Sequence, residues 1–166
     1  MLVAHYIGDH AQDALNVRLG CALTKLVQKG PYKNVTHCEA ILKNWGGGVA
    51  DIASSSLRDN GVRIKERVIL KPTNWIIANV ELWDAEEARA WFVQHKGEPY
   101  DSRGAWATVM PGHHRDGAHF CNESVGESVG SFLTPYCYTP SEFAAITLSF
   151  GKLWTKEFFA QAIMPA

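Results

Sequence analysis

The middle of the chain consists of short apolar segments separated by turn signals, with no helix-length segment between them. Residues 35–42 alternate in polarity, so His37 and Glu39 are expected on the same face of one strand. A glycine-rich hairpin loop at residues 44–48 and an Asp-Asn-Gly turn at residues 59–61 connect this strand to the following ones. Strands joined by such short connections pair antiparallel, which argues against a parallel sheet with crossover helices.

Helices are expected on both sides of this strand region. Apolar residues spaced three or four apart predict an amphipathic helix within residues 11–29. After the strands, Asp84 is a predicted N-cap, and a helix is expected to begin at Cys121 and to reach about residue 132. Another helix begins near Pro140. The predicted fold class is therefore α+β, an antiparallel sheet packed against helices.

The composition is that of a globular protein and excludes several kinds of partner. The 166 residues fit a single domain, residues 1–166, and 46% of them are hydrophobic. The 16 basic and 17 acidic residues leave a net charge of −1, so no basic excess favours nucleic acid. No apolar run reaches the ~20 residues of a transmembrane segment, and the first residues lack a signal-peptide pattern. We expect a protein that is cytoplasmic as synthesised.

Among the four cysteines, Cys121 has the sequence context of a nucleophile. The thiols at positions 21, 38, 121 and 137 form no CxxC pair, which argues against a zinc finger or a thioredoxin-like site. Cys121 stands at the predicted start of a helix. There the helix dipole lowers the pKa of a thiol, and an unpaired backbone N–H can stabilise an acyl oxyanion. A buried structural cysteine is the alternative interpretation.

His37 is the candidate general base. It lies within a hydrophobic alternation, where an imidazole needs a polar partner. A thiol nucleophile would be such a partner, because the imidazole can take the thiol proton. A surface histidine on an edge strand is the alternative.

Several local motifs, in this order, resemble one known family. They are a histidine strand at residues 35–41, a strand and turn at residues 54–63, Tyr100-Asp101 with Gly104, Phe120-Cys121-Asn122-Glu123, and Thr139-Pro140-Ser141-Glu142-Phe143. Together they resemble the circularly permuted branch of the NlpC-like papain-fold cysteine hydrolases, in its phage or prophage versions. That branch includes the YiiX-type and lecithin:retinol acyltransferase-like proteins, and in it the histidine precedes the cysteine. Asn122 departs from the family pattern, which has serine there.

The resemblance implies a fold, an activity and a substrate class. It implies a circularly permuted papain-like domain whose motifs span residues 35–145, followed by a tail at residues 151–166. It also implies that Cys121 attacks the carbonyl of an amide or ester while His37 transfers the proton. The implied partners are peptide or acyl substrates, with peptidoglycan favoured by the phage-like segment. No cofactor is implied.

The residue that orients His37 is open among four candidates. The family places a polar residue on the strand after the histidine, and matching the turn at residues 61–63 puts Ser55 there. Counting across the hairpin also allows Ser54, because a slip of one residue changes the face. Asp51 is the only carboxylate of that strand, and Glu39 shares the strand face of His37. We prefer the Ser54–Ser55 pair over Glu39.

Two other interpretations complete the analysis. His113, His114 and His119 could bind a metal together with His37, but their spacing matches no zinc signature, so no metal is expected. His119 is expected at the mouth of the cleft, and Asp101 as a helix cap. The rival to a cysteine hydrolase is a phage structural or assembly module that keeps the fold without strong activity. Its aromatic C-terminal tail would then bind a partner.

Overall fold

The computed structural model describes residues 1–9, 11, 13–108, 116–130 and 138–162. The elements, in chain order, are β1 (Leu2–Tyr6), α1 (Leu15–Val27), β2 (His37–Gly46), β3 (Val49–Ser56), β4 (Gly61–Ile69), β5 (Trp75–Asn79), α2 (Ala85–Gln94), α3 (Ser102–Ala107), α4 (Cys121–Glu127), α5 (Pro140–Phe150), β6 (Lys152–Leu153) and α6 (Thr155–Ala160).

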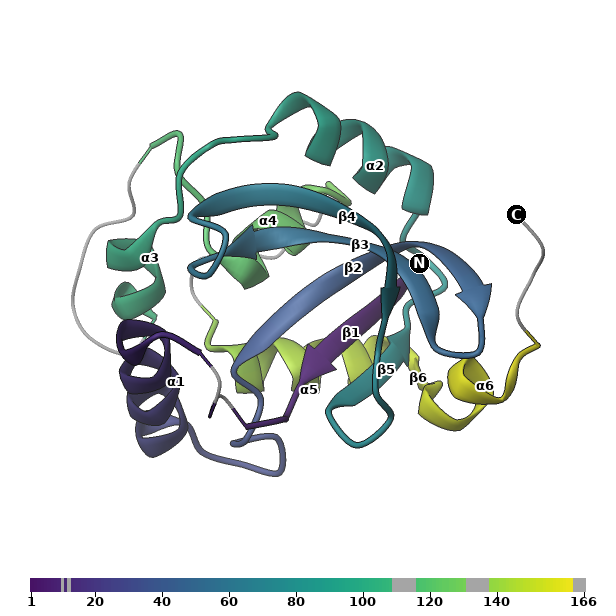
Figure 1. Cartoon of the computed structure of the whole chain (residues 1–166), viewed down its shortest axis with the longest axis horizontal. Helices are drawn as coiled ribbons and strands as arrows, with labels where there is room; N and C mark the ends of the chain where they lie inside the picture. The colour runs from purple at the N-terminus through teal and green to yellow at the C-terminus, as the bar shows by residue number, and fades with distance from the viewer. Residues whose placement is uncertain (10, 12, 109–115, 131–137, 163–166) are drawn as a thin grey trace.

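The strands form one sheet in the order β4-β3-β2-β1-β5-β6 (Figure 1). Every neighbouring pair is antiparallel, which confirms the predicted α+β class. Strand β2, which begins at His37, lies inside the sheet between β1 and β3. An element that packs against the His37 end of β2 can therefore contact the first residues of this strand.

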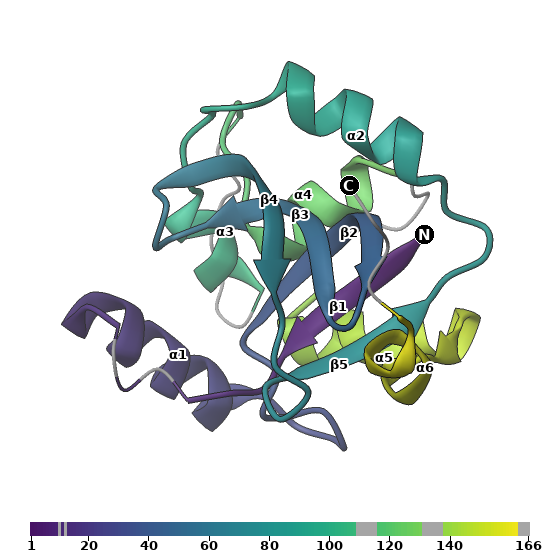
Figure 2. The same cartoon turned by 45° about the vertical axis from the view of Figure 1, so that its right-hand side comes forward.

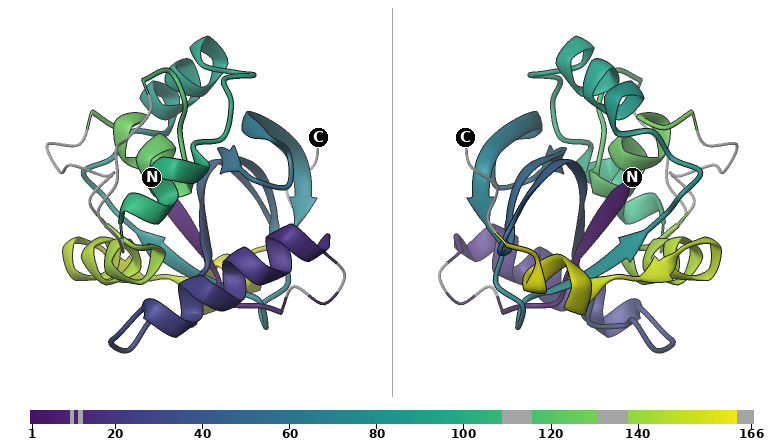
Figure 3. Two further views of the ribbon diagram at one scale, coloured as in Figure 1. Left: turned by 90° about the vertical axis from the view of Figure 1, so that its left-hand side faces the viewer. Right: turned by 90° about the vertical axis from the view of Figure 1, so that its right-hand side faces the viewer.

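Alternate residues of β2 enter two separate hydrophobic cores. Cys38, Ala40 and Leu42 belong to a core that also contains side chains of α2, α4 and α5. Ile41 belongs to the second core, with Phe158 of α6. Figure 3 shows α4 and α5 on one side of the sheet. The alternation places His37 and Glu39 on the face of Ile41, as the sequence predicts.

The predicted helix starts are confirmed by their capping contacts. The Asp84 side chain accepts hydrogen bonds from two backbone N–H groups of the first turn of α2. Asp101 accepts from the N–H of Gly104, which gives this residue the predicted capping role in α3. Thr139 and Glu142 form a reciprocal capping box at the start of α5.

Helix α1 forms within the predicted segment, but most of its apolar side chains lie at the surface. Leu15 is 67% exposed and Leu26 is 79% exposed, whereas Val17 is buried. Figure 2 shows α1 projecting at one side of the molecule. No helix in the described ranges is both long and apolar enough to cross a membrane.

Candidate active site

Cys121 is the first residue of α4, as the sequence predicts. Its side chain is 3% exposed, and Phe120 precedes it in an extended conformation. The backbone N–H groups of a first helical turn have no partner within the helix, so they and the dipole favour negative charge at this thiol. Helix α4 ends at Glu127, before the predicted end at residue 132, and residues 131–137 lie outside the described part.

His37 connects the thiol to a carboxylate. Its Nε2 lies 2.8 Å from Oε1 of Glu39, and its ring adjoins the Cys121 sulfur closely enough for each to shift the pKa of the other. Because Nε2 is engaged by Glu39, Nδ1 is the nitrogen that remains for the thiol. Burial lowers the pKa of His37, but the Glu39 charge and the contacts of the ring with Glu39 and Cys121 outweigh it and raise that pKa to about 9.

Glu39 is in turn held by Arg63 of β4. Its carboxylate accepts two hydrogen bonds from the guanidinium, one of them 2.6 Å long, although only 3% of the Glu39 side chain is exposed. Burial alone would raise the Glu39 pKa, but Arg63 and His37 lower it to about 2. Asp59 binds the far side of Arg63 at 2.9 Å. Glu39 is therefore ionised across the physiological range.

Two neighbouring residues of the Cys121 sulfur, Cys38 and His37, favour its thiolate. Hydrogen bonds from Cys38 and the neighbouring His37 hold the pKa of Cys121 well below its usual range, although burial opposes ionisation. Burial and the adjacent Cys121 raise the pKa of Cys38, so Cys38 remains a thiol and a donor. Oδ1 of Asn122 is an acceptor for both thiols, 3.3 Å from Cys38 and 3.4 Å from Cys121, so Cys121 can donate to it only while protonated. The Asn122 amide is fixed by donating to the carbonyl of Tyr138 at 2.8 Å.

A pocket of about 470 Å³ opens onto these residues. Its lining includes the three polar residues of the site and apolar side chains of α1 and α3, which are Cys121, His37, Glu39, Val17, Leu23 and Trp106. Pockets of this size hold small molecules or part of a larger chain. The exposed helix α1 thus forms one wall beside the thiol.

The preference for Ser54 or Ser55 as the partner of His37 is wrong in this structure, because Glu39 makes that hydrogen bond. The Ser54 hydroxyl donates to the carbonyl of Ser55, and the Ser55 hydroxyl donates to the carbonyl of His119. Asp51 accepts from the indole of Trp45 and from the backbone N–H of Arg67, so its carboxylate is also committed elsewhere.

The histidines considered as metal ligands do not come together as a set. His113 and His114 lie outside the described residues. His119 is 7% exposed, and its ring contacts Glu98 rather than His37. It is absent from the pocket lining, so its predicted place at the cleft mouth is wrong.

Sequence reasoning missed two residues that adjoin the site. Arg63 lies within residues 54–63, one of the segments on which the resemblance rests, but its contact with Glu39 depends on the pairing of β3 with β4, in which Ser54 opposes Arg63. Cys38 alternates out of the His37 face into the core that also contains Cys121, and there its thiol adjoins the Cys121 sulfur. The sequence signal for Cys38 is its position directly after His37, the candidate base.

Comparison with protein-family models, with curated proteins and with solved structures finds no match to this chain.

Proposed function

We propose that the protein is a cysteine hydrolase of papain-like type, with a circularly permuted connectivity in which the histidine strand precedes the nucleophile helix. The observation that carries the proposal is the series Cys121–His37–Glu39 at the wall of the pocket, in which His37 adjoins the thiol and is hydrogen-bonded to Glu39. A nucleophile, a base and a group that orients the base, in that order, are what covalent acyl transfer requires.

In the proposed reaction the Cys121 thiolate attacks a substrate carbonyl and forms a C–S bond. The backbone N–H of Cys121 stabilises the oxyanion that develops on the carbonyl oxygen. The His37 imidazolium gives its proton to the departing amine or alcohol as the C–N or C–O bond breaks. Water then attacks the thioester and transfers a proton to His37. The C–S bond breaks, which releases the acid and restores the thiolate.

Glu39 positions His37 in this mechanism. A carboxylate on Nε2 holds the ring so that Nδ1 faces the sulfur, and it stabilises the imidazolium. Because Arg63 keeps Glu39 ionised, the imidazolium–thiolate pair is favoured over the neutral pair. Glu39 is thus a positioning residue and Arg63 supports it.

The proposed substrates are amides or esters with an extended acyl or peptide portion. The family resemblance points to cell-wall peptides or to lipid esters and amides, and the phage-like segment favours peptidoglycan peptides. The pocket supports an acyl or side-chain group of moderate size, since apolar residues of α1 and α3 line it.

Acyl-enzyme trapping tests the proposal without knowledge of the natural substrate. The full chain is incubated with an activated ester such as p-nitrophenyl butyrate, quenched in acid and analysed by peptide mass spectrometry. We expect a butyryl thioester on Cys121, its loss in Cys121→Ala, and formation at least about 100-fold slower in His37→Ala at neutral pH.

Cys21 provides a matched control inside the same pocket. Burial and Asp13 raise the pKa of Cys21 to about 11, so this thiol should remain unmodified, and Cys21→Ala should still acylate at Cys121. Equal labelling of Cys21 and Cys121, or no adduct on a folded protein, would contradict the proposal. The structural-module interpretation would then be favoured.

A further inference from the structure

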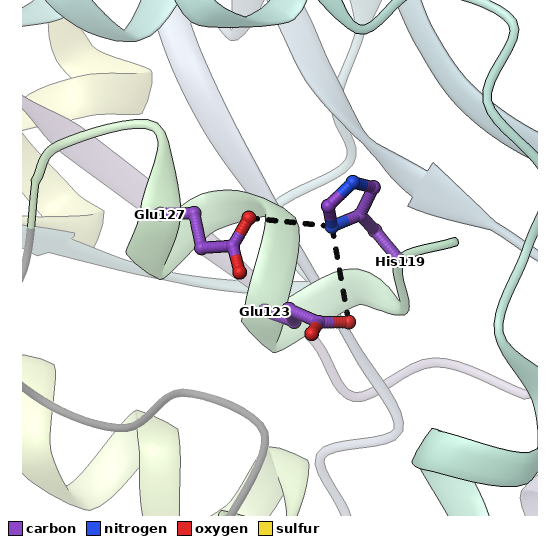
Figure 4. Close-up of side chains that lie close together, drawn as sticks. All are labelled: His119, Glu123 and Glu127. Atoms are coloured by element: carbon purple, nitrogen blue, oxygen red, sulfur yellow. Dashed lines mark ion pairs between the residues drawn. The ribbon is translucent and has the colours of Figure 1, made fainter. Parts of the chain in front are cut away.

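A second cluster of polar side chains lies on the other side of α4. His119 precedes the helix, and Glu123 and Glu127 follow at intervals of four residues, so all three share one side of it (Figure 4). Nδ1 of His119 lies 3.3 Å from Oε2 of Glu127 and 3.9 Å from Oε2 of Glu123. The ligand atoms of the three residues lie within 4.8 Å of one another.

Glu98 sets the tautomer of His119. Its Oε2 lies 2.7 Å from Nε2 of the ring, so Nε2 carries a proton that it donates to the carboxylate. In the neutral ring this leaves a lone pair on Nδ1. A carboxylate behind the far nitrogen is the arrangement that orients metal-ligating histidines and makes them more basic.

Nδ1 of His119 is directed at the two carboxylates but is not hydrogen-bonded. It is buried, and it makes no hydrogen bond to any atom of the described residues. The backbone around it is fixed, because the N–H of His119 donates to Pro99 and its carbonyl accepts from Asp101. The ring also packs edge-on against Trp91, with centroids 5.1 Å apart. The ring nitrogen is therefore held in place, facing the carboxyl groups of Glu123 and Glu127.

We propose that His119, Glu123 and Glu127 form a binding site for a divalent transition-metal ion, with Zn²⁺ the best fit. Zinc bonds of roughly 2.0–2.2 Å place tetrahedral ligand atoms about 3.3–3.6 Å apart. The separation between His119 and Glu127 already has this value, and that to Glu123 exceeds it by a few tenths of an ångström. A proton on Nδ1 could reach only Glu127, since 3.9 Å is beyond hydrogen-bond range.

The ligand chemistry supports this assignment. One imidazole and two carboxylates suit Zn²⁺, whereas Ca²⁺ and Mg²⁺ prefer oxygen ligands alone. Two carboxylates and a neutral imidazole would balance the charge of a divalent cation. The Glu127 side chain is 35% exposed, so an ion and a water as fourth ligand can reach the site from solvent.

The site would fix the nucleophile helix without taking part in catalysis. Glu123 and Glu127 lie roughly 200–240° around the helix from Cys121, so a bound ion would not contact the thiol. It would hold His119, which is already bonded to Glu98, against the first two turns of α4. The proposal is independent of the proposed hydrolase activity and would stand if that activity failed.

Metal titration of the purified full chain tests the site. Zn²⁺ binding is measured by calorimetry at neutral pH, and the melting temperature is recorded with and without Zn²⁺. Co²⁺ is added as a spectroscopic probe, because ligation by thiols gives an intense near-ultraviolet band that nitrogen and oxygen ligands do not give. We expect about one ion per chain, a higher melting temperature with Zn²⁺, and no thiolate band.

Conservative variants assign the ligands. Glu127→Gln and Glu123→Gln should each weaken Zn²⁺ binding at least about tenfold, and glutamine at 123 can still accept the hydrogen bond from the N–H of Phe120. The exposed control Glu66→Gln should leave the affinity unchanged. No binding by the wild type at ~100 µM Zn²⁺, a thiolate band, or unchanged affinity in both variants would each overturn the proposal.

Discussion

Glu39 is nearly inaccessible to solvent and yet carries a charge, which only its two basic neighbours make favourable. Arg63 and His37 both contact its carboxylate, and only 3% of the side chain is exposed. Removing one member of a buried ion pair leaves the other uncompensated, which is strongly destabilising. Glu39 therefore contributes to folding as well as to the orientation of His37.

Acid should remove the contribution of Glu39 to stability. Its folded-state pKa of about 2 is depressed from 4.5, which corresponds to roughly 3 kcal/mol. Because the folded pKa is the lower one, this stabilisation is fully present above about pH 4.5 and is lost as the pH falls toward 2. Urea unfolding should show Glu39→Gln to be about 2–3 kcal/mol less stable than wild type at neutral pH, with a gap that closes in acid.

The exposed variant Glu66→Gln is the control for this series, and its stability should stay within about 0.5 kcal/mol of wild type at every pH. If the difference in unfolding free energy between wild type and Glu39→Gln were the same at neutral pH and at about pH 3, Glu39 would not be held ionised as described.

Alternation along one strand was enough to place Glu39 beside His37 as a candidate, but not to choose it over the serines. That choice depends on the positions of the side-chain atoms. Arg63, which lies two strands away in the sheet, binds the Glu39 carboxylate and fixes its position. The Ser55 hydroxyl instead donates to the carbonyl of His119. Cross-strand contacts of this kind depend on register, which the sequence alone leaves open by a residue.

At the scale of elements, the start of β4 is fixed by a close backbone approach. Gly61 adopts a φ of +148°, and a Cβ there would lie 2.0 Å from the carbonyl oxygen of Glu98. The next residue, Val62, donates its N–H to that same carbonyl at 2.9 Å. This contact ties β4 to the segment that carries Glu98 and Tyr100.

Alanine at two glycines should have opposite effects. Gly61→Ala should lower the free energy of unfolding by about 2–4 kcal/mol, because the backbone atoms it meets cannot move aside. Gly20→Ala lies within α1, where nothing stands within 4 Å of the added atom, and should raise it by about 0.5–1 kcal/mol. Chemical denaturation measures both, and a neutral Gly61→Ala would contradict the close approach.

The sequence predicted the strands and most helix starts well, because these depend on local signals. Turn glycines and the caps Asp84, Asp101 and Thr139 act within a few residues. The apolar periodicity of α1 also predicted its helix, but periodicity does not say what covers a helix face. In the structure, Leu15 and Leu26 remain exposed. The i, i+4, i+8 spacing of His119, Glu123 and Glu127 is visible in the sequence, but only the structure shows that the three side chains converge.

For the whole molecule, the C-terminal segment completes the second core. Phe158 of α6 is fully buried beside Ile41 and Ile77 of the sheet, so this part of the tail packs on the body of the protein. The face of β2 that carries His37 and Glu39 is thus supported by residues more than a hundred positions away.

Phe158→Ala should therefore destabilise the whole fold. A buried phenylalanine reduced to alanine typically costs about 3–5 kcal/mol in unfolding free energy. Phe150→Ala is the matched control, since that ring is 62% exposed, and should cost less than about 1 kcal/mol. Similar stabilities of the two variants in urea titrations would show that α6 does not contribute to the core.

The most direct test of the account is the pH dependence of Cys121 alkylation by iodoacetamide, followed by peptide mass spectrometry in wild type and His37→Ala. Wild-type Cys121 should react as a thiolate well below the pKa of ~8.5 of a free thiol, with a second change in rate near the His37 pKa of about 9. In His37→Ala the second change should vanish and the thiol pKa should rise by at least about one unit. If both proteins titrate alike near ~8.5, Cys121 and His37 do not form the proposed pair.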